Sequence, residues 1–209
     1  MHFQIEFNIK KTSMKRFVSI ATIIASFIFL MSCGNGNQKW NISNTQINTN
    51  VLGLNLCEES DENAIKKAIS KEINKEVLWD FYKLGVGTTV RVVPMSSDIN
   101  YEGLSWNYVD VTLNEENQIV QITIVASYNN IEKAKEQFAA ATKVFNQKYG
   151  KGNTYEENHY GIWTNGSNYV DLTLETEDAA IGNDRIFCSI SYVNIELGNA
   201  FDEASASEI

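Results

Sequence analysis

Apolar and polar positions in residues 51–197 repeat with two different periods. In two segments apolar side chains recur every three or four residues, which is the spacing of a helix that buries one face. The first segment follows Ser60, a good N-cap residue, and the second ends at Gly150, a common helix stop. The apolar stripes consist of Ala64, Ile65, Ala68, Ile69 and Ile73 in the first segment and of Ile131, Ala134, Phe138, Ala141, Phe145 and Tyr149 in the second. We therefore predict two helices.

Runs that alternate, or that are rich in β-branched and aromatic residues, follow each predicted helix and indicate strands. Asn165 and Gly166 form a dipeptide typical of a tight hairpin turn. The predicted strands cover residues 51–56 as a short leading strand, then 87–94, 101–113 and 117–128, and then 153–164, 168–175 and 186–193. The order is one helix and three strands, twice. Antiparallel strands beside segregated helices predict an α+β fold, with the helices on one face of an antiparallel sheet.

A short sequence repeat links the two halves. Residues 107–113 read NYVDVTL and residues 168–174 read NYVDLTL, with six of seven positions identical at a spacing of 61 residues. Self-similarity at a fixed distance indicates duplicated structural units. We therefore divide the predicted domain, residues 51–197, into two repeats over 51–130 and 131–197.

This element order resembles the tandem repeats of the β-lactamase inhibitor protein family. A single unit is similar to the small lipoproteins of the outer-membrane β-barrel assembly machinery. The resemblance covers most of residues 51–195 and rests on element order and on weak motifs such as the Lys148-Tyr149-Gly150 helix end. It implies a sheet with one free face, whereas function does not follow from a fold alone.

The N-terminal part has another pattern. Lys15 and Arg16 precede an apolar run over residues 17–30, which is shorter than the about 20 residues that span a bilayer. The run ends in Leu30-Met31-Ser32-Cys33, which resembles the lipobox of bacterial lipoproteins. The resemblance implies cleavage before Cys33 and acyl chains on that cysteine, which would anchor the protein to a membrane through lipid.

We accordingly expect residues 1–32 to be a signal peptide, with Met14 as a more natural start than Met1. The alternative is that residues 17–32 form a buried helix and that Cys33 carries an incidental thiol.

The segments that flank the domain are polar. Residues 33–50 are rich in Gly, Asn, Thr and Gln, and we predict a flexible tether there. No acidic run follows Cys33 at residues 34–38, which favours an outer-membrane lipoprotein that faces the periplasm over one exported to the cell surface. Residues 198–209 are predicted to form a disordered acidic tail.

Net charge restricts the class of partner. The chain carries −9, and removal of residues 1–32 takes away four basic residues and one acidic residue, which leaves −12. Such a chain is repelled by the phosphates of nucleic acids and of anionic lipids, so we expect no nucleic acid partner. It also contains neither a Walker loop nor a G-x-G-x-x-G motif, so we expect no nucleotide.

Catalytic and metal-binding chemistry has little support. His159 is the one histidine after residue 32, which excludes zinc sites and mechanisms built on paired imidazoles. No G-x-S-x-G turn accompanies it, so we predict a structural role for His159, no enzyme, no cofactor and no metal site. Cys57 and Cys188 either form a disulfide in an oxidising periplasm or stay free, with Cys188 as a small apolar residue of the core.

Aromatic residues of the repeat motif remain as a candidate site. Alternation along residues 106–113 turns Val109 and Val111 towards the helices and the intervening side chains towards the free face. The candidate partner-binding face consists of Trp106, Tyr108, Trp163 and Tyr169. It would suit an envelope protein or a glycan, because aromatic residues dominate binding hot spots. The alternative is that both tryptophans cover the edge of the core.

These patterns favour an envelope lipoprotein that acts as a non-catalytic binding or assembly module. An inhibitor of a secreted or envelope hydrolase is the alternative, and an enzyme of unrecognised type is a third class.

Overall fold

The computed structural model describes residues 46–84, 86–155, 159–176 and 185–207, which fold into a mixed α+β domain. Its helices are α2 (Glu62–Ile73), α3 (Ile131–Tyr149) and α4 (Ile195–Ser207). The large sheet consists of β3 (Val77–Leu84), β4 (Gly87–Pro94), β7 (Tyr108–Leu113), β8 (Ile119–Tyr128), β9 (Asn153–Tyr155), β10 (Tyr160–Thr164), β11 (Asn168–Thr176) and β12 (Ile186–Asn194). Two short hairpins consist of β1 (Asn50–Val51) with β2 (Leu54–Asn55) and β5 (Ile99–Tyr101) with β6 (Leu104–Trp106). The predicted α+β class is confirmed.

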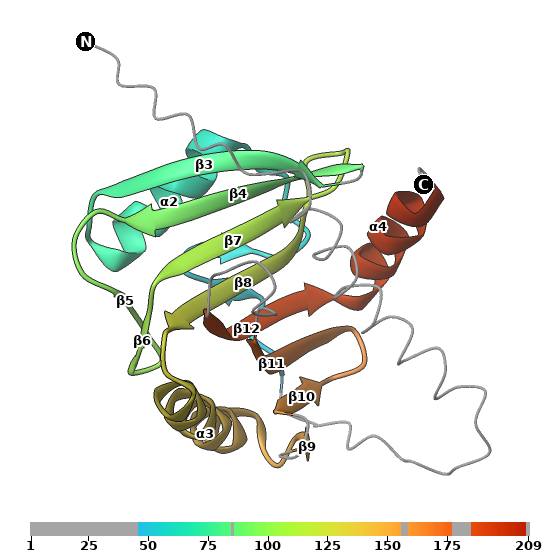
Figure 1. The fold of residues 1–209 in the computed structure, drawn as a ribbon. Coiled ribbons are helices and arrows are strands. Elements are labelled where there is room, and N and C mark those ends of the chain that lie inside the picture. Colours follow the sequence, from blue (N-terminus) through green and yellow to red (C-terminus); the bar gives the residue numbers. More distant parts are fainter. Residues whose placement is uncertain (1–45, 85, 156–158, 177–184, 208–209) are drawn as a thin grey trace, which may run out of the picture.

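The strands of the large sheet are all antiparallel and follow the order β3-β4-β7-β8-β12-β11-β10-β9. The four strands that precede α3 occupy one side of the sheet and the four that follow it occupy the other. The strands β8 and β12 meet in the middle, where Ala126 lies opposite Cys188 (Figure 1). The predicted count of one helix and three strands per half is therefore wrong, because each half contributes four strands.

The missed strand in the first half is β3. Its sequence, VLWDFYKL, places apolar side chains on both faces, as an edge strand can, so no clean alternation marks it. The predicted strand over residues 101–113 is divided at Asn107 into β6 and β7. The backbone N–H of Asn107 donates to the Val125 carbonyl over 2.8 Å, and its Oδ1 accepts from the Ser127 N–H over 2.6 Å.

Side-chain caps define where α2 and α3 begin, and a glycine defines where α3 ends. The N-cap of α2 is Asp61 and not Ser60, because the Asp61 carboxylate accepts from the Ala64 N–H over 2.8 Å. Asn130 caps α3 in the same way, by accepting from the Lys133 N–H over 3.1 Å. Gly150 follows α3 with a φ of 81°, the left-handed region that glycine adopts without strain. The predicted helix stop at Gly150 is thus confirmed.

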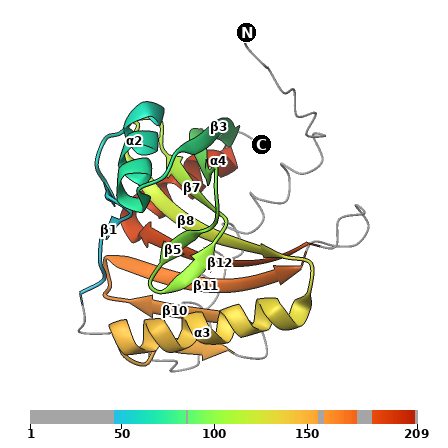
Figure 2. The same cartoon turned by 90° about the vertical axis from the view of Figure 1, so that its left-hand side faces the viewer.

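One hydrophobic core lies between the sheet and the helices α2 and α3, which cover the same face at opposite ends of the strand order (Figure 2). The sheet contributes Val90, Val92, Val109, Val111, Ile122, Ile124, Val170, Leu172 and Ile190, and the helices contribute Ile65, Ile69, Phe138, Ala141 and Phe145. The predicted inward position of Val109 and Val111 is confirmed. Because apolar burial supplies most of the folding free energy, this shared core joins both halves into one cooperative unit.

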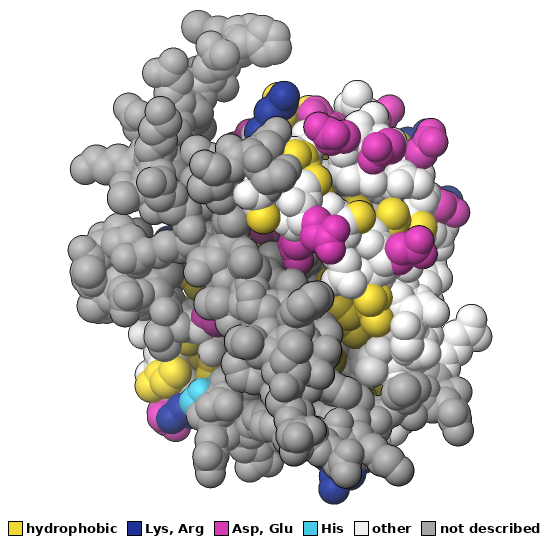
Figure 3. Space-filling model, turned by 90° about the vertical axis from the view of Figure 1, so that its right-hand side faces the viewer, with side chains coloured by type: hydrophobic (Ala, Val, Ile, Leu, Met, Phe, Trp, Pro, Cys, Tyr) yellow, Lys and Arg dark blue, Asp and Glu magenta, His cyan; other side chains and the backbone are white. Residues whose placement is uncertain are grey.

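Both predicted domain ends are wrong. Ile47 is buried in the core, so the part of the tether nearest the domain is packed against it. The predicted disordered tail from residue 198 is a helix, α4, up to residue 207. Phe201 of α4 packs against Gly87, where an added Cβ would lie 2.4 Å from the ring, so glycine is needed at that position. Figure 3 shows acidic side chains spread over the described part of the face that carries α4.

The predicted signal peptide, the lipobox with Cys33 and most of the tether lie outside the described residues. Within the described ranges, no helix has the length and apolar character needed to cross a bilayer.

Candidate functional site

The two tryptophans of the predicted binding face are buried, which corrects that prediction. Trp106 lies on β6, and the bend at Asn107 separates it from the alternation of β7. Trp163 lies opposite Val170, a core residue. Each indole N–H reaches a backbone carbonyl: Trp106 donates to Tyr101 and Trp163 to Gly150, both over 3.1 Å. The alternative, that both tryptophans pack over the core, is confirmed.

Tyr108 lies on the face of the sheet opposite α2 and α3, as predicted, but this face also carries α4, and the Tyr108 ring is covered by a neighbouring side chain. The guanidinium carbon of Arg91 lies 4.2 Å from the Tyr108 ring centroid, within the range of a cation–π interaction. Arg91 also forms a bidentate ion pair with Asp110, at 2.7 Å and 2.6 Å. Burial raises the pKa of Tyr82 beside them, and the Asp110 carboxylate adds to that shift, so Tyr82 stays neutral. These four side chains form a closed structural cluster.

The equivalent position in the second half has no basic partner within the described ranges. Asp171 lies opposite Ile162, whereas Asp110 lies opposite Arg91. Asp171 is 3% exposed, and in the part of the chain that the structure describes its Oδ1 has no hydrogen-bond partner. Burial raises the pKa of Asp171 to about 7, although hydrogen bonds with Ser191 oppose the shift. Tyr169 is beside it, and its own pKa is raised by burial and by the Asp171 carboxylate.

The two cysteines do not pair, so the predicted possible disulfide is not formed. Cys57 is exposed, and its backbone N–H donates to Ile119 at the start of β8. Cys188 is buried opposite Ala126, near the end of the same strand. At about 3.3 Å per residue these two points are on the order of 20 Å apart, far beyond the about 7 Å that a disulfide allows between Cα atoms. The alternative of a free apolar Cys188 is confirmed.

The described residues give little basis for catalysis at His159 or for a metal site. The His159 ring meets the Phe138 ring edge to face at a centroid distance of 6.0 Å, a packing contact with the middle part of α3. No group of three or more His, Cys, Asp or Glu side chains that could hold a metal ion occurs in the described ranges.

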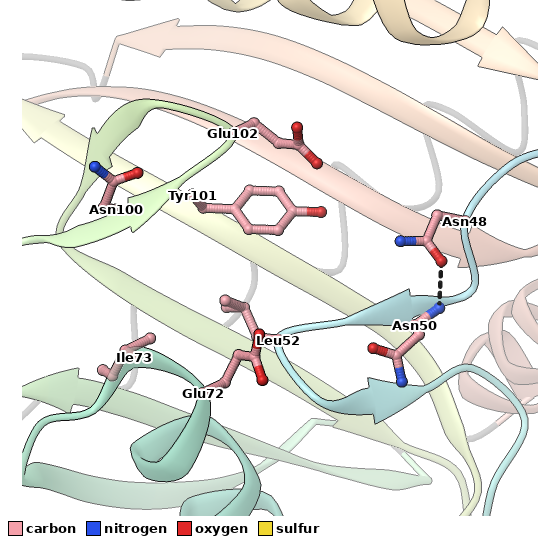
Figure 4. A pocket seen from close by; sticks show the side chains of 8 residues that line it. All are labelled: Asn48, Asn50, Leu52, Glu72, Ile73, Asn100, Tyr101 and Glu102. Atoms are coloured by element: carbon pink, nitrogen blue, oxygen red, sulfur yellow. Dashed lines mark hydrogen bonds between the residues drawn. The ribbon is translucent and has the colours of Figure 1, made fainter.

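A pocket on the helix side of the sheet is the strongest candidate for a binding site (Figure 4). Its volume is about 380 Å³, within the usual size range of small-molecule sites. It lies between the segment around β1, the C-terminal end of α2 and the β5–β6 hairpin. The lining residues are Asn48, Asn50, Leu52, Glu72, Ile73, Asn100, Tyr101 and Glu102.

Two tight hairpins form opposite walls of this pocket. In the first, the turn residues Leu52 and Gly53 have φ values of 52° and 78°, and in the second Glu102 and Gly103 have 54° and 75°. Two residues with positive φ joining a strand pair are the signature of a type I′ turn, which matches the twist of the flanking strands. Both walls are therefore built on short, well-defined turns rather than on long loops.

Hydrogen bonds hold the lining side chains in place. The Tyr101 ring extends across the middle of the pocket, and its hydroxyl lies 2.8 Å from that of Tyr192 in the core (Figure 4). The Asn48 Oδ1 accepts from the Asn50 N–H over 3.0 Å. Lys148 of α3 forms an ion pair with Glu102. The pocket is thus anchored to both the core and α3.

Several polar groups of the lining are left over for a ligand. Within the described residues, the Asn100 amide and the Glu72 carboxylate form no hydrogen bond, and Asn48 uses only its oxygen. An amide supplies two N–H donors and one acceptor oxygen, so it can bind a hydroxyl in either sense. Lys148 balances Glu102, whereas Glu72 has no ion-pair partner among the described residues, so the described lining carries a negative charge that disfavours anions.

The sequence pattern did not indicate this pocket. Asn48 and Asn50 fell in the predicted tether, Tyr101 and Glu102 fell at the start of the predicted strand over residues 101–113, and Asn100 fell just before it. The available signal was the Glu102-Gly103 pair followed by an apolar residue, which is typical of a hairpin turn.

The chain matches no protein-family model, and no curated protein or solved structure is significantly similar to it.

Proposed function

We propose that this protein is an envelope lipoprotein, anchored through lipid on Cys33 and facing the periplasm, that acts as a non-catalytic binding module. Its ligand is a neutral polyhydroxyl compound of the oligosaccharide class, bound in the pocket between β1, α2 and the β5–β6 hairpin. The tandem-repeat origin of the sheet belongs to the same proposal, since the repeated motif at 107–113 and 168–174 lies on β7 and β11.

The observation that carries the proposal is the composition of the pocket wall. Three asparagine amides and the Glu72 carboxylate, which forms no ion pair with the described part of the chain, surround an aromatic ring in a cavity of about 380 Å³. A sugar hydroxyl can donate and accept hydrogen bonds at the same time, so amide and carboxylate groups can both bind it. The apolar ring of Tyr101 offers a surface on which the C–H face of a sugar can pack. The excess of negative charge argues against phosphate or sulfate groups on the ligand.

Binding is tested by titration calorimetry of the full-length protein in detergent against neutral N-acetylglucosamine oligomers, after a screen of neutral and charged glycans. We expect Asn100→Ala to weaken binding about threefold to tenfold, the equivalent of one hydrogen bond. Asn129→Ala is the matched control, because Asn129 is an exposed asparagine outside the pocket. Preference for anionic glycans, an absence of glycan binding, or an equal loss in the control variant would contradict the proposal.

The anchor is tested separately by growing cells with an alkyne-labelled fatty acid. The mature protein is expected to carry the label and to begin at Cys33, and Cys33→Ala is expected to lose the label. A labelled Cys33→Ala chain would overturn the assignment of the anchor without affecting the pocket.

A further inference from the structure

The outer edge of β3 is unpaired among the described residues, since β3 ends the strand order of the sheet (Figure 1). The direction of its backbone groups follows from one hydrogen bond: the Met95 N–H donates to the Glu76 carbonyl over 2.9 Å. Hydrogen-bonded pairs alternate along an antiparallel ladder, so the even-numbered residues of β3 bond to β4. The N–H and C=O groups of the odd-numbered residues, Trp79, Phe81 and Lys83 among them, therefore point outward.

Apolar side chains flank this open edge. Leu78 is 59% exposed and Phe81 is 52% exposed, and alternation places them on opposite faces of the sheet. The other edge of the sheet is β9, which has only three residues, so β3 with its eight residues is the long open edge. A long edge with exposed apolar side chains is a template for another strand.

We infer that β3 pairs with β3 of a second copy of this chain, antiparallel and centred on Phe81, to form a sheet that continues across a two-fold axis. The axis must stand perpendicular to the sheet, because only this rotation brings two equal edges together in antiparallel orientation. This rotation keeps each side chain on the same face of the sheet, so an odd-numbered residue of one copy lies opposite an odd-numbered residue of the other. The free N–H and C=O groups of β3 belong to odd-numbered residues, so they can bond to one another across the axis.

Charge favours a centre at Phe81 over the adjacent centre at Asp80. Centred on Phe81, the pairing sets Trp79 opposite Lys83 of the other copy and Asp80 opposite Tyr82. A centre at Asp80 would instead set two carboxylates face to face, which destabilises a strand pair. A lysine against an indole is a favourable neighbour, as in the same chain, where Lys66 Nζ lies 5.9 Å from the Trp79 ring centroid.

The edge is capped locally in the single copy. The Phe81 N–H donates to the Asp80 carboxylate over 2.8 Å, which occupies the central donor of the proposed ladder. Pairing exchanges this exposed contact for a bond to the Phe81 carbonyl of the other copy, and it covers both phenyl rings. One strand pair buries less than a standard interface of 1,200–2,000 Å², so the dimer is weak, with dissociation expected in the micromolar range.

The test is sedimentation equilibrium of the full-length protein in a density-matched detergent, at concentrations up to on the order of 100 µM. We expect twice the protomer mass for the wild type and for Met95→Lys. Phe81→Lys is expected to be monomeric, because it sets two positive charges opposite each other. Met95 is the matched control, since it is 58% exposed and lies outside β3. A monomeric wild type, or an equal effect of both substitutions, would overturn the inference.

Cysteine crosslinking in intact membranes checks the register. Opposed Cα atoms in a hydrogen-bonded pair are about 5.5 Å apart, within disulfide range. In a Cys57→Ser background we expect Phe81→Cys to form a crosslinked dimer under mild oxidation and Met95→Cys to form none. Crosslinking of Met95→Cys alone would place the contact elsewhere and overturn the register.

Discussion

Asp171 lies opposite Ile162 in the register of β11 and β10, while its counterpart Asp110 lies opposite Arg91. Two carboxylates at equivalent positions of the sequence repeat therefore have different surroundings. Asp110 forms an ion pair with Arg91, whereas Asp171 is buried with no basic neighbour in the part of the chain that the structure describes, and it favours its protonated form. The difference arises from the neighbouring strand and not from the repeated motif.

The first prediction concerns the pH dependence of stability. The pKa of Asp171 is about 7 in the folded chain against an ordinary value of 3.8. The folded state therefore retains its proton where the unfolded chain has lost it, and folding is favoured most below about pH 4. As the pH rises from about 4 to about 7, the free energy of unfolding falls, by on the order of 4 kcal/mol for a shift of this size, and it levels off at higher pH.

Thermal unfolding between pH 4 and pH 8 checks this. We expect the melting temperature of Asp171→Asn to change less with pH than that of the wild type over this range. Asp202, whose pKa is raised to about 6 by burial, acts in the same direction and accounts for part of the remaining slope. Glu116→Gln, in the exposed turn before β8, is the control and is expected to keep the wild-type slope. An unchanged slope in Asp171→Asn would show that Asp171 ionises normally in the folded chain.

The second prediction concerns the ion pair of Arg91 and Asp110. Their side chains are 33% and 12% exposed, so removal of one partner leaves a largely desolvated charge. We expect Arg91→Ala to cost on the order of 2–3 kcal/mol, less than the loss for a fully buried pair. In contrast, Lys135→Ala removes the exposed pair with Glu132 and is expected to change stability by less than about 0.5 kcal/mol.

Urea unfolding of the single and double variants of Arg91 and Asp110 gives the coupling energy of the pair. A coupling close to that of Lys135 with Glu132 would mean that the Arg91 pair is solvated and contributes little.

The third prediction concerns the buried tryptophan on β6. Trp106 fills the space between the sheet and α3, and its indole N–H is bonded to Tyr101. Trp106→Ala is expected to cost about 3–5 kcal/mol, as large-to-small changes in cores do. Trp79→Ala, at the partly exposed edge strand, is expected to cost less. Chemical denaturation measures both, and a small loss for Trp106→Ala would return this residue to the surface as a candidate for binding.

Local sequence patterns were sufficient to predict the structure where a helix or strand buries one face and exposes the other. The stop at Gly150 and the inward side of β7 follow from local patterns, and the structure agrees with both. The stripe of α3 is also buried from Ala134 to Tyr149, whereas its first predicted member, Ile131, is exposed. The hairpin at Asn165-Gly166 also forms, although its two central residues are Gly166 and Ser167, since the Asn165 N–H donates to the Asn168 carbonyl over 3.2 Å. Such features depend on neighbours in sequence.

Other features depended on contacts between distant segments. The orientation of Trp106 changes at the bend of Asn107, which is held by Val125 and Ser127 of β8. The polar segment around Asn48 is ordered because Ile47 enters the core. The helix α4 has a weakly amphipathic sequence and is docked by Phe201 against Gly87. None of these contacts leaves a local period in the sequence.

The sequence by itself thus determined the helices α2 and α3, most of the antiparallel strands other than β3, and the face that each core residue of β7 takes, because backbone geometry and apolar burial act over a few neighbouring residues. The tertiary structure alone decided the strand order, the edge position of β3, the separation of Cys57 from Cys188 and the pocket between two hairpins. Those depend on which distant segments exclude water from each other, and many orders of strands bury the same apolar side chains equally well.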